Sequence, residues 1–335
     1  MKNRAGSTAL SHYTAPPWLP GGHLQTIYAY ALRQTMNFTY RRERWETPDG
    51  DFIDLDWLDP SPESSSLVVL FHGLEGSSRG HYAICLMNEL KRRGLRGVVV
   101  HFRGCSGEVN RLARAYHSGD SSEIDWILRR FREREPNIRL YAVGVSIGGN
   151  MLLKWLGEQG ENASGVVERV AAISVPVDLA IAAQRLDSGS NQLIYTSRFL
   201  RSMKPKVLAK IAAHGLPIDG RALHATSTFR EIDDLYTAPI HGFKDANHYW
   251  QRASSKPWLR RIRVPTLMIG ARNDPFFPGD ALPTSVEVSN RVALEFSQTG
   301  GHVGFVSGKF PGHLSWLPSR ILRFFLPGDR KFYIC

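Results

Sequence analysis

The sequence is poor in cysteine and has no long apolar run, and each absence narrows what the chain can be. Its 335 residues contain three cysteines, Cys85, Cys105 and Cys335. An odd number this small forms no disulfide framework, so we expect a reducing compartment. No apolar run approaches the roughly 18–20 residues that a membrane-spanning helix needs. Residues 1–10 also lack the apolar core of a signal peptide, and we therefore expect a cytoplasmic protein without a transmembrane segment.

Internal repeats, low-complexity stretches and extremes of composition are also missing. Hydrophobic residues make up 42% of the chain and charged residues 22%, close to the ordinary globular average. This balance excludes a disordered chain, a coiled coil and a collagen-like repeat. A chain of this length forms one large domain or two modest ones and can bury a sizeable core.

The most unusual bulk property is the formal net charge of +11, from 42 Lys+Arg and 31 Asp+Glu. Such a balance suggests nucleic-acid binding. The basic residues, however, fall in short, separate clusters, at residues 41–44, 91–93, 129–132 and 260–263. We therefore expect solvated faces and no dedicated nucleic-acid site. Weak, salt-sensitive attraction to polyanions or peripheral contact with a membrane surface stays compatible with the charge.

Short apolar runs alternate with helix-length segments along most of the chain. Runs that are apolar at every position suit strands covered on both faces, and six of them lie at 67–71, 97–101, 138–143, 170–175, 264–269 and 291–296. Helical patterns mark residues 81–93, 120–134, 147–157 and 314–325. This alternation predicts an α/β fold with a mostly parallel central sheet and helices on both faces.

Two segments depart from this alternation. Residues 38–45 and 52–58 alternate polar and apolar positions around a Pro-Asp-Gly turn signal, so we expect an antiparallel edge hairpin. Residues 178–256 contain helical patterns and no convincing strand. We interpret them as a helical lid inserted into an α/β core that is formed by residues 1–177 and 257–335.

The third apolar run leads into Gly144-Val145-Ser146-Ile147-Gly148, which matches the G-x-S-x-G pattern. A strand before this pattern and a helix after it are the context of a nucleophile elbow, a sharp turn that exposes the serine hydroxyl above the sheet. The flanking glycines are needed because larger side chains would collide with the neighbouring strand or helix. Close packing of a helix on a strand would also use small residues, but the context favours Ser146 as a nucleophile.

The first apolar run leads into the sequence HGLEG at residues 72–76. A loop of this kind supplies one oxyanion-hole donor in folds that carry a nucleophile elbow. We expect the backbone N–H groups of Leu74 and Ile147 to hold the oxyanion. The side chain of His72 is interpreted as a structural brace of the loop.

A serine nucleophile needs a base, and the base needs an orienting acid. Of the twelve histidines, His302 lies in a glycine-flanked loop just past the last apolar run, and His313 is the alternative. Asp274 follows the fifth run, where the acid is expected. Its rival Asp178 follows the fourth run, where it would cap a helix. The chain order of serine, then aspartate, then histidine suits a hydrolase triad.

Other stretches have more ordinary explanations. Arg103 could meet a substrate carboxylate, but ion pairs that tie loops together are the commoner use of such an arginine. Metal-binding and nucleotide-binding motifs are missing, so we expect neither a metal nor another cofactor. Five residues of the expected lid could line an acyl groove or could equally form its core: Leu193, Ile194, Tyr195, Phe199 and Leu200.

Together these motifs resemble the α/β-hydrolases, and more narrowly the YheT-like esterases, a bacterial branch related to lipases of the mammalian ABHD1, ABHD2 and ABHD3 type. The resemblance implies a carboxylic ester hydrolase with Ser146, Asp274 and His302 as its charge-relay residues. The matching motifs are PWLPGGHLQT at 17–26, HGLEG at 72–76, FRGCSG at 102–107, YHSGD at 116–120, GVSIGGN at 144–150 and NDP at 273–275.

We therefore predict a serine carboxylic ester hydrolase whose partner is a small-molecule ester with a short- to medium-chain acyl group. Monoacylglycerol-type lipids are further candidates. Two alternatives stay open at this stage. One is a binding module that uses a hydrolase scaffold without catalysis, because fold alone does not establish activity. The other is weak nucleic-acid binding by the basic surface.

Overall fold

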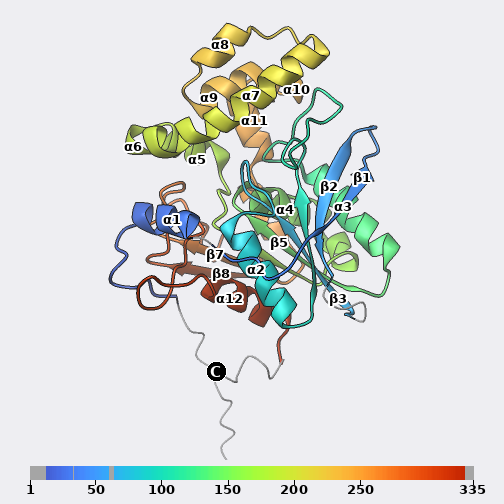
Figure 1. Cartoon of the computed structure of the whole chain (residues 1–335), viewed down its shortest axis with the longest axis vertical. Helices are drawn as coiled ribbons and strands as arrows, with labels where there is room; N and C mark the ends of the chain where they lie inside the picture. Colours follow the sequence, from blue (N-terminus) through green and yellow to red (C-terminus); the bar gives the residue numbers. More distant parts are fainter. Residues whose placement is uncertain (1–12, 33, 60–63, 329–335) are drawn as a thin grey trace, which may run out of the picture.

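The computed structural model describes residues 13–32, 34–59 and 64–328. The expectations about residues 1–10 and Cys335 fall outside this part of the chain. A central sheet is enclosed by helices, and a further group of helices lies at one end of the molecule (Figure 1). Within the described residues, no helix is both long enough and apolar enough to cross a membrane.

The sheet has eight strands in the order β1-β2-β4-β3-β5-β6-β7-β8. β1 pairs antiparallel with β2, and β2 pairs antiparallel with β4, whereas all other neighbours are parallel. The predicted α/β class, with a mostly parallel sheet, is confirmed. The strands span Arg41–Glu46 (β1), Phe52–Leu58 (β2), Ser66–Phe71 (β3), Arg96–His101 (β4), Arg139–Val145 (β5), Arg169–Ile173 (β6), Thr266–Ala271 (β7) and Val292–Ser297 (β8).

Helices cover both faces of the sheet because successive strand residues point to opposite sides and are apolar on each. Val98 and Val100 of β4 belong to a hydrophobic cluster shared with α3 and α4, whereas Val99 belongs to one shared with α2 and α12. The helices that cover the faces are α2 (His81–Arg92), α3 (Ser121–Arg134), α4 (Ile147–Gln159) and α12 (Trp316–Phe325). Two further helical elements are α1 (Gly22–Ala31), which precedes the sheet, and η1 (Gly160–Gly165), which follows α4.

Between β6 and β7 the chain leaves the sheet and forms the group of helices seen above it in Figure 1. These helices form their own hydrophobic cluster, which also includes Leu74 and Phe276 from the loops after β3 and β7. The elements are α5 (Leu179–Leu186), α6 (Gly189–Asn191), η2 (Gln192–Thr196), α7 (Ser197–His214), α8 (Gly220–Ala225), α9 (Phe229–Ile232), η3 (Asp233–Thr237), α10 (Ala238–Ile240) and α11 (Ala246–Ala253). The segment returns to the core through η4 (Lys256–Arg261), whose Leu259 belongs to the hydrophobic cluster shared with α3 and α4.

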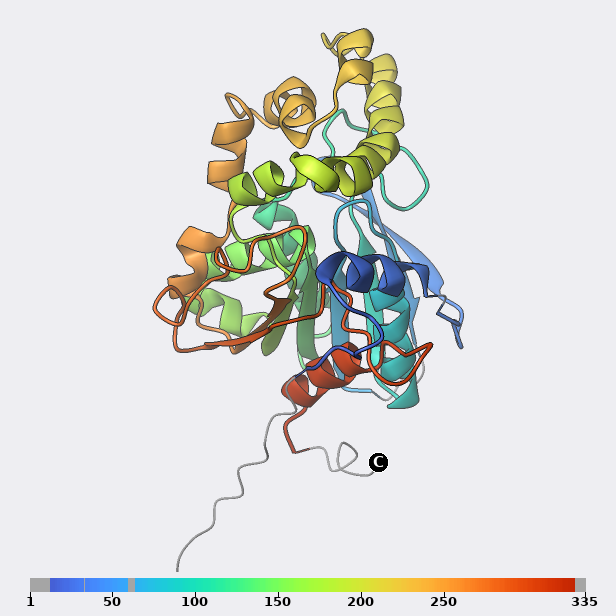
Figure 2. The same cartoon turned by 90° about the vertical axis from the view of Figure 1, so that its left-hand side faces the viewer.

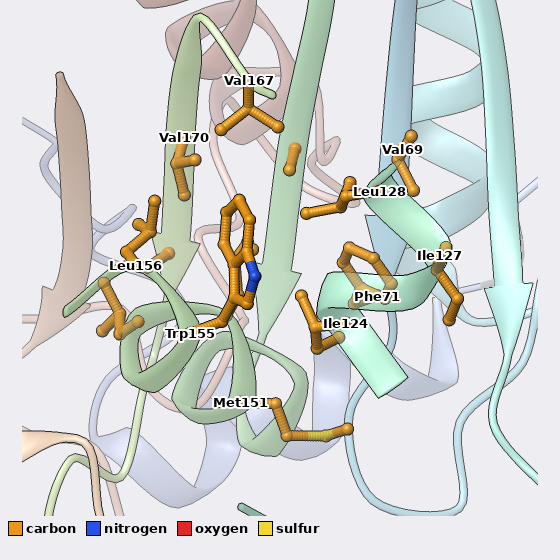
Figure 3. Close-up of a cluster of buried hydrophobic side chains, with 14 of the residues drawn as sticks. Val69, Phe71, Ile124, Ile127, Leu128, Met151, Trp155, Leu156, Val167 and Val170 are labelled. Atoms are coloured by element: carbon orange, nitrogen blue, oxygen red, sulfur yellow. The ribbon is translucent and has the colours of Figure 1, made fainter. Parts of the chain in front are cut away.

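The largest hydrophobic cluster lies between the sheet and the layer of α3 and α4. Trp155 of α4 is fully buried there and lies among side chains of β3, α3 and α4, including Phe71 and Leu128 (Figure 3). Its indole N–H donates a 2.8 Å hydrogen bond to Asp125 of α3, so the polar atom has a partner. This packing holds α4 against the sheet and fixes the position of the helix N-terminus.

Replacing Trp155 with alanine is expected to lower the free energy of unfolding by about 3–5 kcal/mol, because it leaves a large cavity beneath the sheet. Urea titration followed by circular dichroism measures the loss. Val286→Ala is the control, because Val286 is 71% exposed and its truncation should change stability by no more than about 0.5 kcal/mol. Equal effects of the two substitutions would contradict this placement of the core.

Candidate active site

A sharp turn joins β5 to α4 at Ser146. The backbone of Ser146 has φ 54° and ψ −121°. Residues other than glycine rarely adopt this backbone conformation. The N–H of Ser146 donates a 2.8 Å hydrogen bond to the carbonyl of Ile173 at the end of β6. The next residue, Ile147, is the first of α4. The sequence pattern therefore corresponds to a strand, a strained serine and a helix, in that order.

Two glycines make this turn sterically possible. A Cβ on Gly148 would lie 2.4 Å from the carbonyl oxygen of His72, and a Cβ on Gly144 would lie 2.6 Å from the Cα of Gly149. The first turn of α4 thus packs directly against the end of β3 and against the loop that follows it. Because of this contact, the Ser146 side chain lies beside Gly73, where an added Cβ would be 3.2 Å from the serine Cβ.

The loop after β3 is held by polar contacts from several elements. The N–H of Gly73 donates to the hydroxyl of Tyr82 at 3.0 Å, and the N–H of Glu75 donates to the hydroxyl of Tyr116 at 2.9 Å. Leu74 lies between these two anchored residues. Its backbone position is therefore fixed, one residue from the contact between Gly73 and the serine.

His72 braces this loop, as the sequence suggested. Its buried Nε2 accepts a 3.1 Å hydrogen bond from the N–H of Phe102, so the proton must be on Nδ1, which donates to the carbonyl of Gly73 at 2.7 Å. Burial lowers the pKa of His72 to about 3. The imidazole is therefore neutral at physiological pH and serves as a fixed donor and acceptor.

Asp274 and His302 lie next to each other in the loops that follow the carboxyl ends of β7 and β8. Asp274 lies three residues past β7, and its Oδ2 accepts a 2.8 Å hydrogen bond from Nδ1 of His302. Its other oxygen accepts from the N–H of Phe276 at 2.8 Å. The ring of Phe276 stacks on the imidazole with a centroid distance of 4.0 Å. The carboxylate and one face of the imidazole are thus shielded from water.

Backbone contacts tie the histidine loop to the serine turn. The N–H of Val303 donates to the hydroxyl of Ser174 at 3.1 Å. Ser174 directly follows Ile173, which accepts the hydrogen bond from Ser146. The loops that carry the serine and the histidine are therefore attached to two consecutive residues at the end of β6. The turn that carries Ser146 and the loops that carry Asp274 and His302 therefore leave the sheet at the same rim.

The rival residues have other roles in the structure. Asp178 caps α5 by accepting a hydrogen bond from the N–H of Ile181. His313 pairs through its backbone with Ser307, and its ring contacts Ser315. Arg103 is buried and pairs with three carboxylates that hold neighbouring loops together, those of Asp49, Asp51 and Glu123.

One set of contacts was not foreseen from the sequence. The side chains of Gln25 and Thr26, in the PWLPGGHLQT motif, make hydrogen bonds to the loops of Asp274 and His302. The resemblance to the YheT-like esterases includes this motif, and the sequence indicates no more than a place near the mouth of the site for it. No local pattern in it indicates which distant loop these two polar side chains bind.

The comparisons with known proteins agree with this geometry. A model of the family described as "alpha/beta hydrolase fold" matches residues 66–309. The chain belongs to the α/β-hydrolase family. The solved structure of the Pyrococcus furiosus esterase Pf2001, which is 18% identical, has the same fold, with a TM-score of 0.56 over 86% of this chain and 92% of that chain.

Curated relatives of this α/β-hydrolase carry the names of ester-cleaving enzymes. YheT of Escherichia coli (strain K12), which is named as an esterase, is 39% identical over 89% of this chain and 88% of that protein. Phospholipase ABHD3 of Homo sapiens is 26% identical over 91% of this chain and 76% of that protein. The resemblance to the YheT-like esterases is confirmed, and the chain is a hydrolase of the esterase and lipase type.

Acidification is expected to destabilise this hydrolase, because burial lowers the pKa to about 3 for His72 and His241 and to about 4 for His81 and His117. In the unfolded chain each of these imidazoles takes up a proton below about pH 6.5. Stability should therefore fall from about pH 6.5 towards pH 4, by up to about 1.4 kcal/mol per pH unit for each histidine. Urea midpoints measured between pH 7 and pH 5 give the slope.

Two variants separate the buried histidines from ordinary surface titration. His72→Asn removes one of the neutral imidazoles and should make the slope of stability against pH shallower. The same substitution at the exposed His224 should leave the slope as in the wild type. If both variants keep the wild-type slope, the buried imidazoles do not cause the acid sensitivity.

Proposed function

We propose that this hydrolase cleaves carboxylic esters through an acyl-enzyme, with Ser146 as nucleophile, His302 as base and Asp274 as orienting acid. The observation that carries the proposal is the partly buried 2.8 Å hydrogen bond between Asp274 and His302 at the rim where the strained serine lies. A carboxylate can only accept this hydrogen bond, so Nδ1 of His302 carries the proton. Nε2 is then the basic nitrogen, as proton abstraction from a serine hydroxyl requires.

The proposed reaction has two halves. His302 takes the hydroxyl proton as Ser146 attacks the ester carbonyl, and the tetrahedral oxyanion is held by the N–H groups of Leu74 and Ile147. The protonated imidazole gives its proton to the leaving alcohol, which departs as the acyl-enzyme forms. His302 then removes a proton from water as the water oxygen attacks the acyl carbonyl. When the bond between the acyl group and Ser146 breaks, His302 returns this proton to the serine oxygen and the acid leaves. Asp274 stabilises the imidazolium in both halves.

We also propose that residues 178–256 act as a lid over a core formed by residues 1–177 and 257–335. Contacts between this segment and the oxyanion loop support the assignment. The Glu75 carboxylate pairs with Lys206 of α7 at 2.7 Å and accepts a hydrogen bond from Tyr116 at 3.2 Å. A shift of α7 would therefore displace the loop that contains Leu74.

The apolar residues of this segment divide into two groups. Tyr195 and Leu200 are buried in its hydrophobic cluster, whereas Leu193 and Ile194 are 76% and 40% exposed. Phe199 is half-buried. Its ring lies edge-on to Phe276, with a centroid distance of 6.0 Å, and Phe276 in turn stacks on His302. An apolar wall thus extends from the base towards the lid, which suits an acyl chain of short to medium length.

The names of the relatives agree with this substrate class. Besides YheT and ABHD3, a medium-chain fatty acid ethyl ester synthase/esterase 2 of Saccharomyces cerevisiae is 30% identical over 78% of this chain and 62% of that protein. A monoacylglycerol lipase of the same yeast is 26% identical over 79% of this chain. We therefore propose short- to medium-chain acyl esters as substrates, with monoacylglycerol-type lipids among them.

Ser146→Ala is expected to abolish hydrolysis of p-nitrophenyl butyrate, with a loss of about 10⁴-fold or more in kcat, because no nucleophile remains. A fluorophosphonate probe should label the wild type at Ser146 and should not label the variant. The exposed Ser164 gives a matched control, and Ser164→Ala should retain full activity. A folded wild-type chain that neither reacts with the probe nor cleaves any ester would instead support a binding module without catalysis.

Phe199→Ala is expected to move the acyl-chain preference towards longer chains, because it removes a ring from the apolar wall. The ratio of kcat/KM for p-nitrophenyl octanoate to that for the acetate should rise by about tenfold, the usual effect of a small change in pocket size. Phe310→Ala, at a phenylalanine that is 73% exposed, is the control and should keep the wild-type profile. Identical profiles for both variants would exclude Phe199 from the acyl site.

A further inference from the structure

We propose that Gln25 and Thr26 of α1 are positioning residues that set how the acid and the base of the triad face each other. The inference rests on the proposed function and adds a part that lies outside residues 66–309, the portion matched by the α/β-hydrolase family model. α1 comes before the first strand of the sheet, yet Figure 2 shows it beside the loops that follow β7 and β8. The side chains of Gln25 and Thr26 make hydrogen bonds to these loops.

Three successive backbone amides of the histidine loop donate to side-chain oxygens. Two of the acceptors belong to α1, and the third belongs to the residue that precedes the acid. Three consecutive N–H groups that all donate to side chains fix the position and the orientation of a short loop relative to the elements that carry those side chains. The pairs are Gly300 N–H to Gln25 Oε1 at 2.8 Å, Gly301 N–H to Asn273 Oδ1 at 3.0 Å and His302 N–H to Thr26 Oγ1 at 2.8 Å.

Gln25 joins the acid loop to the base loop through one side chain. It is 1% exposed. Its Oε1 accepts from the N–H of Gly300 and also from the side-chain amide of Asn273, at 3.0 Å. Its own amide donates to the carbonyl of Leu19 at 2.9 Å, which fixes which end of the side chain is the oxygen. The relative position of the two loops therefore depends on this buried amide.

Thr26 holds the backbone of the base itself. Its hydroxyl donates to the carbonyl of Gly22, one helical turn earlier, at 2.7 Å. With the proton so placed, a lone pair of the oxygen faces the N–H of His302. The next residue, Val303, is held by Ser174 on the other side of the loop. The backbone around His302 is thus held by hydrogen bonds on two sides, from α1 and from Ser174 at the end of β6.

The contact leaves no space between the helix and the loops. A Cβ on Gly22 would lie 1.8 Å from the carbonyl oxygen of Asn273, and one on Gly301 would lie 2.7 Å from the carbonyl oxygen of Gly22. A Cβ on Gly304 would lie 2.7 Å from the carbonyl oxygen of Gln25. Glycines from both sides therefore allow backbone to meet backbone. A displacement of α1 must displace the acid and base loops with it.

Thr26→Val tests the proposal, because valine has nearly the same shape as threonine and cannot accept the hydrogen bond from His302. We expect kcat for p-nitrophenyl butyrate to fall about 10- to 100-fold, the scale expected when a reacting group is misplaced by up to 1 Å. KM should stay within about threefold, because the hydrogen bond that is lost goes to the backbone of His302. Thr26→Ser restores the acceptor and should return kcat to within about threefold of the wild type.

Ile27→Ala is the matched control, since Ile27 is the next residue of the same helix and is 42% exposed. It should keep the wild-type kcat and KM. Gln25→Met is the second variant. It keeps the length of the side chain and removes the acceptor shared by Gly300 and Asn273, so the same fall in kcat is expected. Thermal melts of every variant show whether it is folded at the assay temperature.

The protection of residues 300–303 against hydrogen exchange gives a readout that is independent of turnover. It should fall in Thr26→Val and recover in Thr26→Ser. The proposal is overturned if the folded Thr26→Val and Gln25→Met variants keep the wild-type kcat, if serine does not rescue, or if only KM changes. Failure of the proposed function is a different result, because the wild-type chain would then show neither ester cleavage nor labelling of Ser146.

Discussion

The contact between the first turn of α4 and the end of β3 is the constraint on which the site depends. Gly148 allows the helix to lie against the carbonyl of His72, and Gly144 allows it to lie against the end of its own strand. With the helix in this position, the chain reaches it only through a residue with a positive φ, and that residue is Ser146. Core packing around Trp155 stabilises the helix and so offsets the strain of the turn.

The parallel sheet places the loops of Asp274 and His302 next to the turn that carries Ser146. Loops that follow parallel strands leave from one edge, so residues that are distant in sequence become neighbours there. The N–H of Ser146 donates to the carbonyl of Ile173, and the N–H of Val303 donates to the side-chain hydroxyl of the next residue, Ser174. The serine turn is therefore held by a main-chain contact, whereas the histidine loop depends on particular side chains, Ser174 among them.

The parts of the structure that could be predicted are those with a local cause. Fully apolar runs predicted the strands, and the glycines around Ser146 predicted the sharp turn between strand and helix. Each pattern arises from packing among residues that are close in sequence. The pairing of Asp274 with His302 followed from the order of loops along a parallel sheet. The role of Gln25 could not be predicted, because its partner Gly300 lies 275 residues away and neither side of the contact has a pattern that reveals the other.

The sheet topology also explains why the histidine loop needs support from outside the sheet. β8 lies at the edge of the sheet, where among the described residues it pairs with β7 alone, and five of its six residues are not buried. The loop that carries His302 therefore leaves from an edge strand, although the proposed base tolerates little displacement. β7 can support this loop on one side only. α1 packs against this loop and binds it through Gln25 and Thr26, so a helix that precedes the first strand adds rigidity to a loop at the edge of the sheet.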